Sequence, residues 1–497
     1  MNKKSVFFLV GVSISFLSHF AIAQTEITSN ELIKHLEFLA SDNMQGRFPG
    51  TTQCKEAGKY IAAQFKRSGI KPLSSSYFQP FDINLKFKVG KNNCLSVGPS
   101  SLSFEKDYLP LAFSANGTVE GNVVFVGYGF KTDADTLRIN DYAGLDLKGK
   151  WVLVLKGLPD ALAAKQLLKE QSIDYTKAKQ AEHMGAAGVL FVSGLKSNEK
   201  DELTHMRPRK DKSLGIPVIH IKRTVANQLL SSTGKTIEQL EKEYASTDNK
   251  SLNLNKPLTA SVDLELESVK TNNIVGVIEG IDPVLKAEYI VLGAHYDHLG
   301  HGGYQTGSKK PDTSAIHNGA DDNASGTAAL LSIGRKLAVN RQLLKRSVIL
   351  IAIGAEEEGL LGSDYFVNHP PVPLNTIKGM VNMDMVGRLD SSRNVYVGGA
   401  GTFPDGVALL KSIAAQTDLH ANVFEGGVGG SDHVSFYNKN IPVLGIHTGG
   451  HPQYHTPEDD IQLINKKGIQ AVADFICKAM IALVNLDQPI VFNKPKD

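Results

Sequence analysis

Residues 347–353 read SVILIAI, a serine followed by six consecutive apolar side chains. A run this short is typical of a strand rather than a helix, and its lack of polar alternation indicates that both faces of the strand are covered. Strands covered on both faces are found mainly in parallel sheets that carry helices on either side. The run therefore predicts a central strand of an α/β domain.

Short apolar runs and amphipathic stretches alternate along the chain around this strand. We expect the other strands of the same sheet at 272–279, 288–294, 377–382, 394–397 and 442–446. Apolar residues at helical spacing predict helices at 30–42, 52–69, 323–339, 360–368, 404–417 and 466–484. The alternation predicts an α/β fold with a mixed, largely parallel central sheet flanked by helices.

A second, smaller module interrupts this domain. Short β-rich runs occur at 122–126, 151–155, 189–192 and 217–221, and they alternate with helical stretches near 161–185 and 223–245. We expect residues 116–261 to form this inserted module, and residues 24–115 and 262–497 to form the main domain. Three roles remain open for the module: covering a cleft, supporting dimer contacts, or a purely structural one.

The first residues have the features of a secretory signal. A basic start, Asn2-Lys3-Lys4, precedes a largely apolar stretch at 5–21 and the A-x-A pattern Ala21-Ile22-Ala23. We expect residues 1–23 to be removed and the mature protein to be periplasmic or secreted, with no membrane span left. An uncleaved membrane anchor is the alternative, since the apolar stretch approaches spanning length.

The composition argues against two classes of partner. The 497 residues carry 53 basic and 51 acidic side chains, which gives a net charge of +2. Such a balance provides no electrostatic reason to bind nucleic acid or an anionic membrane surface.

The three cysteines, Cys54, Cys94 and Cys477, have no CxxC metal spacing, and the sequence leaves their pairing open.

Histidines and acids gather just after the predicted strands. His295 follows the strand at 288–294, and Asp297 stands two residues later, where its carboxylate could hold the imidazole in one tautomer. Asp321 and Asp322 lie where the next helix begins. Explanations without chemistry also exist, because a histidine at a strand end is often only hydrogen-bonded and acids at a helix start are often caps.

Further acids and a histidine extend this pattern. Glu356, Glu357 and Glu358 follow SVILIAI, and three adjacent carboxylates repel one another unless a cation is near. Asp384 stands at another strand end, and His455 lies in a polar segment. Each group also has an alternative explanation: an exposed acidic turn for the three glutamates, a hydrogen-bonded structural role for Asp384, and a polar surface turn for the segment of His455. Since the carboxyl ends of parallel strands meet at one crevice, these side chains can converge there, and one glutamate could bind a metal ion while its neighbour moves protons.

The order and spacing of these groups match one family. The chain resembles the di-zinc peptidases that include bacterial leucyl aminopeptidases, glutamate carboxypeptidases and the metal-free transferrin receptors. Gly46-Arg47-Phe48-Pro49-Gly50 is similar to the family's N-terminal segment, and Gly127-Tyr128-Gly129 and Gly185-Ala186-Ala187-Gly188 are similar to its inserted protease-associated domain. The resemblance covers nearly everything after residue 23 and implies the zinc exopeptidase fold.

Metal ligands are part of what the resemblance implies. It implies two Zn²⁺ ions per chain, for which Co²⁺ or Mn²⁺ could substitute. His295 and Asp384 match the ligands of one ion, and Glu357 and His455 match those of the other. No ligand position departs from the family pattern.

The resemblance also assigns bridging and catalytic roles. The bridging carboxylate of the family precedes x-x-Ser-Gly, which selects Asp322 over the preceding aspartate and implies a cis bond between Asp322 and Asn323. Glu356 matches the general base, Tyr454 matches a tyrosine that hydrogen-bonds the developing oxyanion, and Asp297 matches the partner of the first histidine ligand.

These roles predict an exported exopeptidase that removes N-terminal residues from peptides by attack of a metal-bound hydroxide, as a monomer or homodimer. A carboxypeptidase or dipeptidase of the same family is the main alternative. A single-zinc glutaminyl cyclase and a metal-free binding protein are two further alternatives. The full set of five matching ligands argues against the metal-free binding protein. His301 and His317 receive no role.

Overall fold

The computed structural model describes residues 26–134, 137–159, 162, 164–196, 198–204, 213–244, 251–303 and 306–495. The chain forms two compact units, one built from the residues up to Ile83 with Val269–Asp497, and the other from Asn84–Ser268. The expected module at 116–261 lies within the second unit. The expected signal peptide at 1–23 lies outside the described residues. None of the described helices combines the length and apolar character needed to cross a bilayer.

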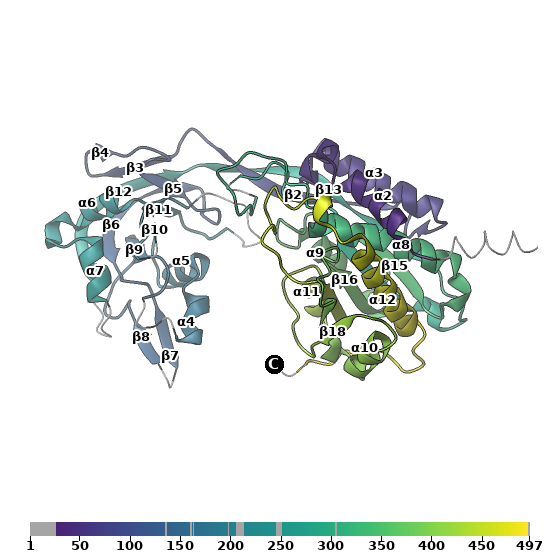
Figure 1. The fold of residues 1–497 in the computed structure, drawn as a ribbon. Coiled ribbons are helices and arrows are strands. Elements are labelled where there is room, and N and C mark those ends of the chain that lie inside the picture. Colours follow the sequence, from purple (N-terminus) through teal and green to yellow (C-terminus); the bar gives the residue numbers. More distant parts are fainter. Residues whose placement is uncertain are drawn as a thin grey trace, which may run out of the picture. The chain divides into compact units, whose positions relative to one another are not determined.

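A nine-stranded mixed sheet is the centre of the first unit (Figure 1). Its middle is parallel, because β14 (Tyr289–His295) pairs with β15 (Ser347–Ile353) and β16 (Ile377–Met383), and β16 pairs with β19 (Val443–His447). The antiparallel neighbours are β13 (Leu264–Ile278) and β17 (Asn394–Gly398). The edges are β1 (Lys71–Pro72), β2 (Phe78–Val89) and β18 (His420–Val423). The expected mixed α/β sheet is confirmed, and its central strands are parallel.

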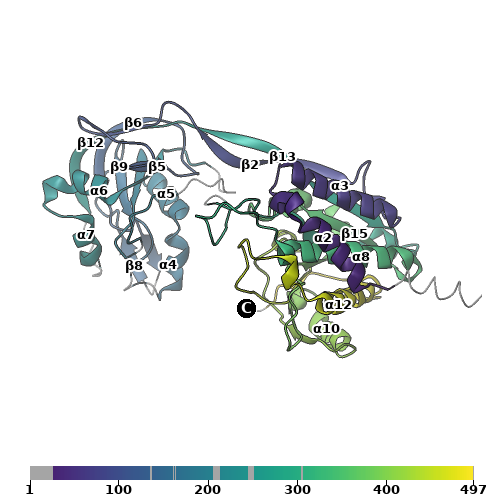
Figure 2. The ribbon, with the colours of Figure 1, turned by 45° about the horizontal axis from the view of Figure 1, so that its top comes forward.

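Helices cover both faces of this sheet because its central strands are apolar on both. Leu350 of β15 packs in a cluster with α2 (Ser29–Leu39), α3 (Thr52–Arg67), α8 (Gly326–Val339), α10 (Gly406–Ala414) and α12 (Lys466–Val484). Its neighbours Ile349 and Ile351 pack on the other face with α9 (Leu361–Asn368) and α11 (His433–Tyr437). Figures 1 and 2 show α2, α3, α8 and α12 together on one side of the sheet.

The limits of these helices follow from capping and apolar spacing. Thr51 caps α3 by accepting the backbone N–H of Cys54, and Asn465 caps α12 by accepting that of Gly468. The buried residues of α12 then recur at three- and four-residue intervals along one stripe, which is the face that packs on the sheet.

A buried arginine ties the N-terminal helices to the loops at the carboxyl edge of the sheet. Arg47 is fully buried, and its guanidinium donates to the carbonyl oxygens of Leu39, Tyr296, Asn318 and Gly319. Burial lowers the pKa of Arg47 to about 10, so the side chain remains charged at neutral pH. The Arg47 contacts therefore join three segments that lie far apart in the sequence.

An eight-stranded sheet is the centre of the second unit. Four strands pair in parallel: β6 (Gly117–Phe125), β9 (Trp151–Leu155), β10 (Gly188–Val192) and β11 (Val218–Ile221). On the β6 side the sheet continues through β12 (Leu252–Val262), β3 (Cys94–Val97) and β4 (Ser100–Ser101), and β5 (Tyr108–Pro110) ends it beside β11. β7 (Lys131–Ala134) and β8 (Leu137–Asn140) form a separate hairpin.

Two apolar clusters fill the two faces of this second sheet. On one face α6 (Arg223–Leu230) and α7 (Ile237–Glu243) pack against Leu153 and Leu155. On the other face α5 (Asp174–His183) packs against Val152 and Val154, and α4 (Gln166–Gln171) precedes it. Figure 2 shows α5 and the pair α6 and α7 on opposite sides of the strands. The second unit therefore has a hydrophobic core of its own.

Candidate metal centre

The ends of adjacent parallel strands bring the predicted site residues to one edge of the first sheet. His295 is the last residue of β14 and lies opposite Ile353, the last residue of β15. Glu356 and Glu357 are in the turn after β15, and Asp384 comes directly after β16. Ligands bind to α/β sheets at this carboxyl edge.

Asp322 lies between two histidines. It belongs to an irregular helical turn, Ala320–Ser325, so the helix expected from 323 begins only at Gly326. Oδ1 of Asp322 is 3.1 Å from Nε2 of His295, and Oδ2 is 3.1 Å from Nε2 of His455. The peptide bond after Asp322 is cis, as the resemblance implies. A carboxylate that offers one oxygen to each of two imidazoles has the donor arrangement of a bridging metal ligand.

The other two predicted acidic ligands lie on opposite sides of Asp322, Asp384 beside His295 and Glu357 beside His455. Oδ1 of Asp384 is 3.5 Å from Nε2 of His295, and His295, Asp322 and Asp384 offer donor atoms that all lie within 4.8 Å of one another. On the second side, Oε2 of Glu357 is 3.2 Å from Nε2 of His455. Carboxylate oxygens and imidazole nitrogens are donors that Zn²⁺ accepts in proteins.

A third histidine reaches the second group. His298 is fully buried, and its Nδ1 is 2.7 Å from Oε1 of Glu357. His298, Asp322 and Glu357 also have the distances of a ligand group. No role was predicted for His298, although it ends the run His295-Tyr296-Asp297-His298. His298 and His455 are thus two candidates for the same ligand position.

Buried donor atoms without hydrogen bonds indicate a cation at this edge. Among the residues that the structure describes, Nε2 of His295 and Oδ1 of Asp384 are buried and make no hydrogen bond. Burial alone would lower the pKa of His295, but Asp384, Glu356 and Asp322 raise it well above its usual value. The carboxylates therefore stabilise a positive charge at the centre. Divalent cations can supply this charge in place of the proton on His295.

Two neighbouring glutamates differ in their acidity. Burial raises the pKa of Glu356 well above its usual value, and Glu357 and Asp432 add to this against the opposing effect of His295. Burial also acts on Glu357, but hydrogen bonds from His298 and His455 lower its pKa to about 2. Glu357 is therefore suited to remain ionised as a ligand, and Glu356 to exchange a proton.

Asp297 supports the turn that carries these glutamates. Its carboxylate accepts the backbone N–H of Glu356 at 3.1 Å and that of Glu357 at 3.3 Å. The same carboxylate is 3.8 Å from Nδ1 of His295, whereas the backbone carbonyl of Asp297 is 3.2 Å from that nitrogen. Asp297 thus contacts the imidazole mainly through its main chain and orients the glutamates with its side chain.

Asp459 supports the turn around Asp322, a contact that no local pattern predicts. Asp459 is fully buried, and one of its carboxylate oxygens accepts the backbone N–H groups of Asp321 and Asp322, both at 3.0 Å. Oδ1 of Asp321 in turn accepts the N–H of Gly387 at 2.7 Å. Asp321 therefore connects the turn to the segment after β16, while the carboxylate of Asp322 faces the two histidines.

A cavity of about 290 Å³ borders the centre, and Asp322, Glu356, Asp384, Tyr454 and Lys309 are among the residues that line it. The Tyr454 ring stacks on that of His455, with 3.8 Å between the centroids, and Nζ of Lys309 lies 4.3 Å from the Tyr454 centroid. Burial raises the pKa of Tyr454 above its usual value, so its hydroxyl stays protonated and can donate a hydrogen bond.

Two family models match the chain. The model of peptidase family M28 matches residues 273–480, which include all five predicted ligands, and the PA domain model matches residues 103–229. Aminopeptidase YwaD of Bacillus subtilis is 28% identical over 71% of the chain and 65% of its own length. An aminopeptidase of Pseudomonas aeruginosa is 25% identical over 84% of the chain and 69% of its own length. The chain thus spans about two thirds of the length of each relative.

Solved structures share the fold. An aminopeptidase from Aneurinibacillus sp. strain AM-1 aligns with a TM-score of 0.59 at 22% identity, over 95% of the chain and 98% of its own. A zinc aminopeptidase from Bacillus subtilis aligns with a TM-score of 0.56 at 22% identity, over 95% of the chain and all of its own. Residues 273–480 of the first unit therefore match peptidase family M28, and residues 103–229 of the second unit match the PA domain.

Proposed function

We propose that the chain is a zinc-dependent aminopeptidase that acts on peptides. One observation carries this proposal: Asp322 directs one carboxylate oxygen to His295 and the other to His455, each at 3.1 Å. The match of residues 273–480 to peptidase family M28 and the similarity to bacterial aminopeptidases support the same activity. Export of the mature protein is part of the proposal, and it rests on the signal-like residues 1–23.

Two zinc ions would be held by five side chains. His295 and Asp384 would bind one ion, Glu357 and His455 the other, and Asp322 would bridge them. We prefer His455 to His298 because its Nε2 is within 3.2 Å of an oxygen of both Asp322 and Glu357. When bound, two zinc ions supply Lewis acidity that lowers the pKa of a water molecule from about 15.7 towards about 7 and polarises the peptide carbonyl.

Glu356 would move the proton in the hydrolysis. Its Oε2 is 3.9 Å from Nε2 of His295, and Glu356 lines the cavity that adjoins the ligands. Burial raises the pKa of its carboxyl well above the usual value, which matches a base that accepts a proton near neutral pH and returns it to the leaving amine. Tyr454 lines the same cavity, so its hydroxyl could donate to the carbonyl oxygen as negative charge develops there.

The polar lining of the cavity suits recognition of the amino end of a peptide. Asp322, Glu356 and Asp384 line it, and carboxylate oxygens that zinc does not bind could accept hydrogen bonds from a free α-amine. One observation favours a second candidate, a carboxypeptidase or dipeptidase: Lys309 lines the same cavity and could pair with a substrate carboxylate.

A panel of dipeptides and tripeptides tests both candidates. The zinc-loaded protein is assayed on peptides with free ends, with a blocked amino end and with a blocked carboxyl end. We expect hydrolysis of the peptides with a free amine, including those with an amidated carboxyl end. Cleavage that requires a free carboxylate and tolerates a blocked amine would reject the aminopeptidase assignment, and formation of pyroglutamate without hydrolysis would indicate a cyclase.

Glu356→Gln tests the assignment of the general base. The amide has the size of the carboxyl but cannot accept the proton, so we expect kcat to fall at least about 100-fold, within the usual range for loss of general-base catalysis. Zinc content should stay at that of the unsubstituted protein, which atomic emission measures on the same sample.

Glu458→Gln is the matched control for that substitution. Glu458 is an exposed acid near His455 that pairs with Lys310. The same chemical change there should leave kcat within about twofold. A Glu356→Gln protein with nearly unchanged kcat would remove Glu356 from the mechanism, and one that had lost its zinc would indicate a ligand instead of a base.

A further inference from the structure

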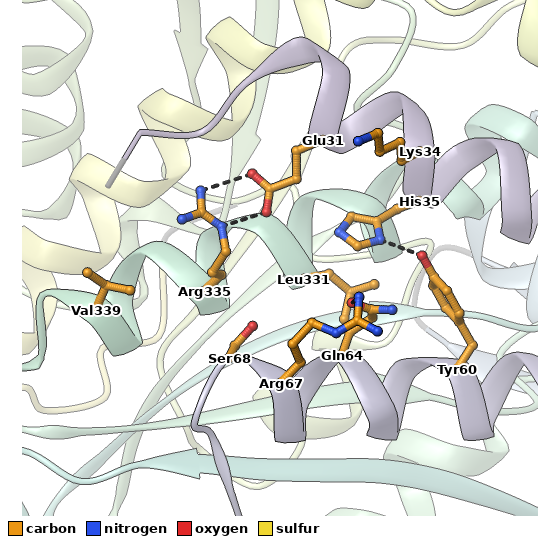
Figure 3. A pocket seen from close by; sticks show the side chains of 10 residues that line it. All are labelled: Glu31, Lys34, His35, Tyr60, Gln64, Arg67, Ser68, Leu331, Arg335 and Val339. Carbon is orange, nitrogen blue, oxygen red and sulfur yellow. Dashed lines mark hydrogen bonds and ion pairs between the residues drawn. The ribbon is translucent and has the colours of Figure 1, made fainter. Parts of the chain in front are cut away.

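We propose that the first unit has a second binding site, for a small organic dianion, between α2, α3 and α8. A cavity of about 450 Å³ lies there (Figure 3). The residues that line it are separate from those of the metal centre, and neither the family match nor the proposed activity assigns them a role. Its position on the helices that cover the sheet, away from the carboxyl edge, makes it independent of the proposed peptidase site.

Positive charge predominates in this cavity. Lys34 of α2, Arg67 of α3 and Arg335 of α8 line it, and Glu31 is the one acid among the lining residues. Glu31 pairs with Arg335 through two contacts, at 2.6 Å to Nε and 2.9 Å to Nη2. This two-contact pair holds the Arg335 guanidinium in place and neutralises its charge.

Lys34 and Arg67 carry the charge that remains. No ion pair of either side chain occurs among the described residues, and Nη1 of Arg67 donates only a long hydrogen bond, of 3.5 Å, to Oε1 of Gln64. Both side chains are exposed at the rim, from two adjacent helices. The cavity therefore has two uncompensated cations at its mouth.

Neutral polar groups line the inner part of the cavity. His35 is buried, and its Nδ1 forms a hydrogen bond of 2.8 Å with the hydroxyl of Tyr60. Burial and, to a smaller extent, the charges of Arg335 and Arg67 together lower the pKa of His35 to about 4, which is consistent with a positive field in the cavity. Figure 3 shows the His35 ring facing the space between Arg335, Leu331 and Arg67.

The chemistry of the lining indicates the class of ligand. Two cations at one rim are matched by two negative charges, and a guanidinium binds the oxygens of a carboxylate or phosphate with two parallel hydrogen bonds. Leu331 and Val339 of α8 provide an apolar wall for a short carbon skeleton. A phosphate monoester or a small dicarboxylate has two negative charges, oxygens that accept hydrogen bonds, and a short carbon skeleton.

Calorimetric titration of the zinc-loaded full chain tests the proposal. Inorganic phosphate and succinate are titrated separately, with sodium chloride adjusted to keep the ionic strength constant. We expect saturable binding of at least one of the two anions, and which one binds distinguishes a phosphate ligand from a dicarboxylate. In Lys34→Gln/Arg67→Gln the affinity should fall at least about tenfold, because the anion loses both of its charged hydrogen-bond donors at the rim.

A double variant with the same change in net charge is the control. Lys55 and Lys66 are exposed lysines of α3 that do not line the cavity, so Lys55→Gln/Lys66→Gln should keep the affinity within about twofold. Absence of saturable binding of both anions overturns the proposal. Equal loss in the two double variants also overturns it, as does binding that survives in Lys34→Gln/Arg67→Gln, since the anion would then bind elsewhere, for example at the metal centre.

Discussion

His298 and His455 contact the same glutamate but differ in their other contacts. His455 is within 3.2 Å of both Asp322 and Glu357, whereas the direct contact of His298 is with Glu357 alone, at 2.7 Å. If His455 is the ligand, His298 is the group that orients Glu357 through a hydrogen bond. Loss of such a supporting residue usually weakens metal affinity about 10- to 100-fold without abolishing the site.

Zinc content distinguishes these two roles. We expect His455→Ala to hold about one zinc ion per chain, and His298→Ala to hold two, with weaker affinity in competition with a chelator. Atomic emission after dialysis measures the content. His301→Ala is the control, because His301 bonds Gln45 at 2.8 Å and contacts no acid of the centre. Loss of one zinc ion from His298→Ala with retention of both in His455→Ala would exchange the two assignments.

Residues at strand ends could be predicted from the sequence, and residues that act across long separations could not. His295, Glu357 and Asp384 each follow an apolar run, so the location of the run also gives the location of the proposed ligand. Asp459 holds Asp322 through a backbone N–H that is 137 positions away. Local patterns carry no signal for such a contact, because only the folded chain brings its two partners together.

At the scale of elements, a close approach of backbones fixes the N-terminal segment against the loops of the site. Gly46 has φ +67°, and a Cβ at this position would lie 2.5 Å from the carbonyl oxygens of Gly300 and His317. The loops that carry Gly300 and His317 are held in place, because the neighbouring residue Arg47 donates hydrogen bonds to the carbonyl oxygens of Tyr296 and Asn318. A side chain at Gly46 would therefore displace a loop that leads to the metal centre.

We expect Gly46→Ala to lower the melting temperature and the zinc affinity together. The strained backbone costs about 1–2 kcal/mol, and the clash adds about 1–3 kcal/mol. Gly69→Ala is a close control, since Gly69 has φ +73° but no atom within 4 Å of an added Cβ. Calorimetry and zinc titration of both variants measure the difference. Equal effects of the two substitutions would mean that backbone strain alone, and not the contact with the loop, limits position 46.

Elements with strong apolar patterns were predicted, and short edge elements were not. The expected strand at 347–353 and the expected helix at 466–484 have the same bounds in the structure. β18 and α11 were missed because they have four and five residues, and β18 has no buried residue to mark a period. β12 was missed because its burial is irregular along the strand, with a register shift against β6.

At the scale of the whole molecule, each unit has its own apolar core, so each should unfold in its own transition. All predicted zinc ligands are in the first unit. Removal of zinc by a chelator should therefore lower the melting temperature of one transition, because binding to the folded state alone stabilises it. The transition that does not respond can then be assigned to the second unit.

A buried lysine gives the second unit a distinct dependence on pH. Lys177 is 1% exposed, and its Nζ donates to the carbonyl oxygens of Leu155 and Gly157 at 2.8 and 2.7 Å. Burial lowers the pKa of Lys177 to about 7, against the opposing attraction of Asp174 and Asp141. An unfolded lysine has a pKa of about 10.4, so between about pH 7 and pH 10 the unfolded chain binds a proton that the folded chain lacks.

The free energy of unfolding increases with pH wherever the unfolded state binds more protons than the folded state. The second unit should therefore become more stable as the pH rises from about 7 to about 10. Lys177→Met should flatten the rise, whereas Lys179→Met, an exposed change in the same helix, should preserve it. Calorimetric scans at pH 7, 8.5 and 10 measure the transition that chelation does not shift. Asp141 does not confuse the result, since burial raises its pKa only to about 6, below the window. An identical pH dependence in both variants would show that Lys177 is protonated in the folded protein throughout, held by its two carbonyl contacts.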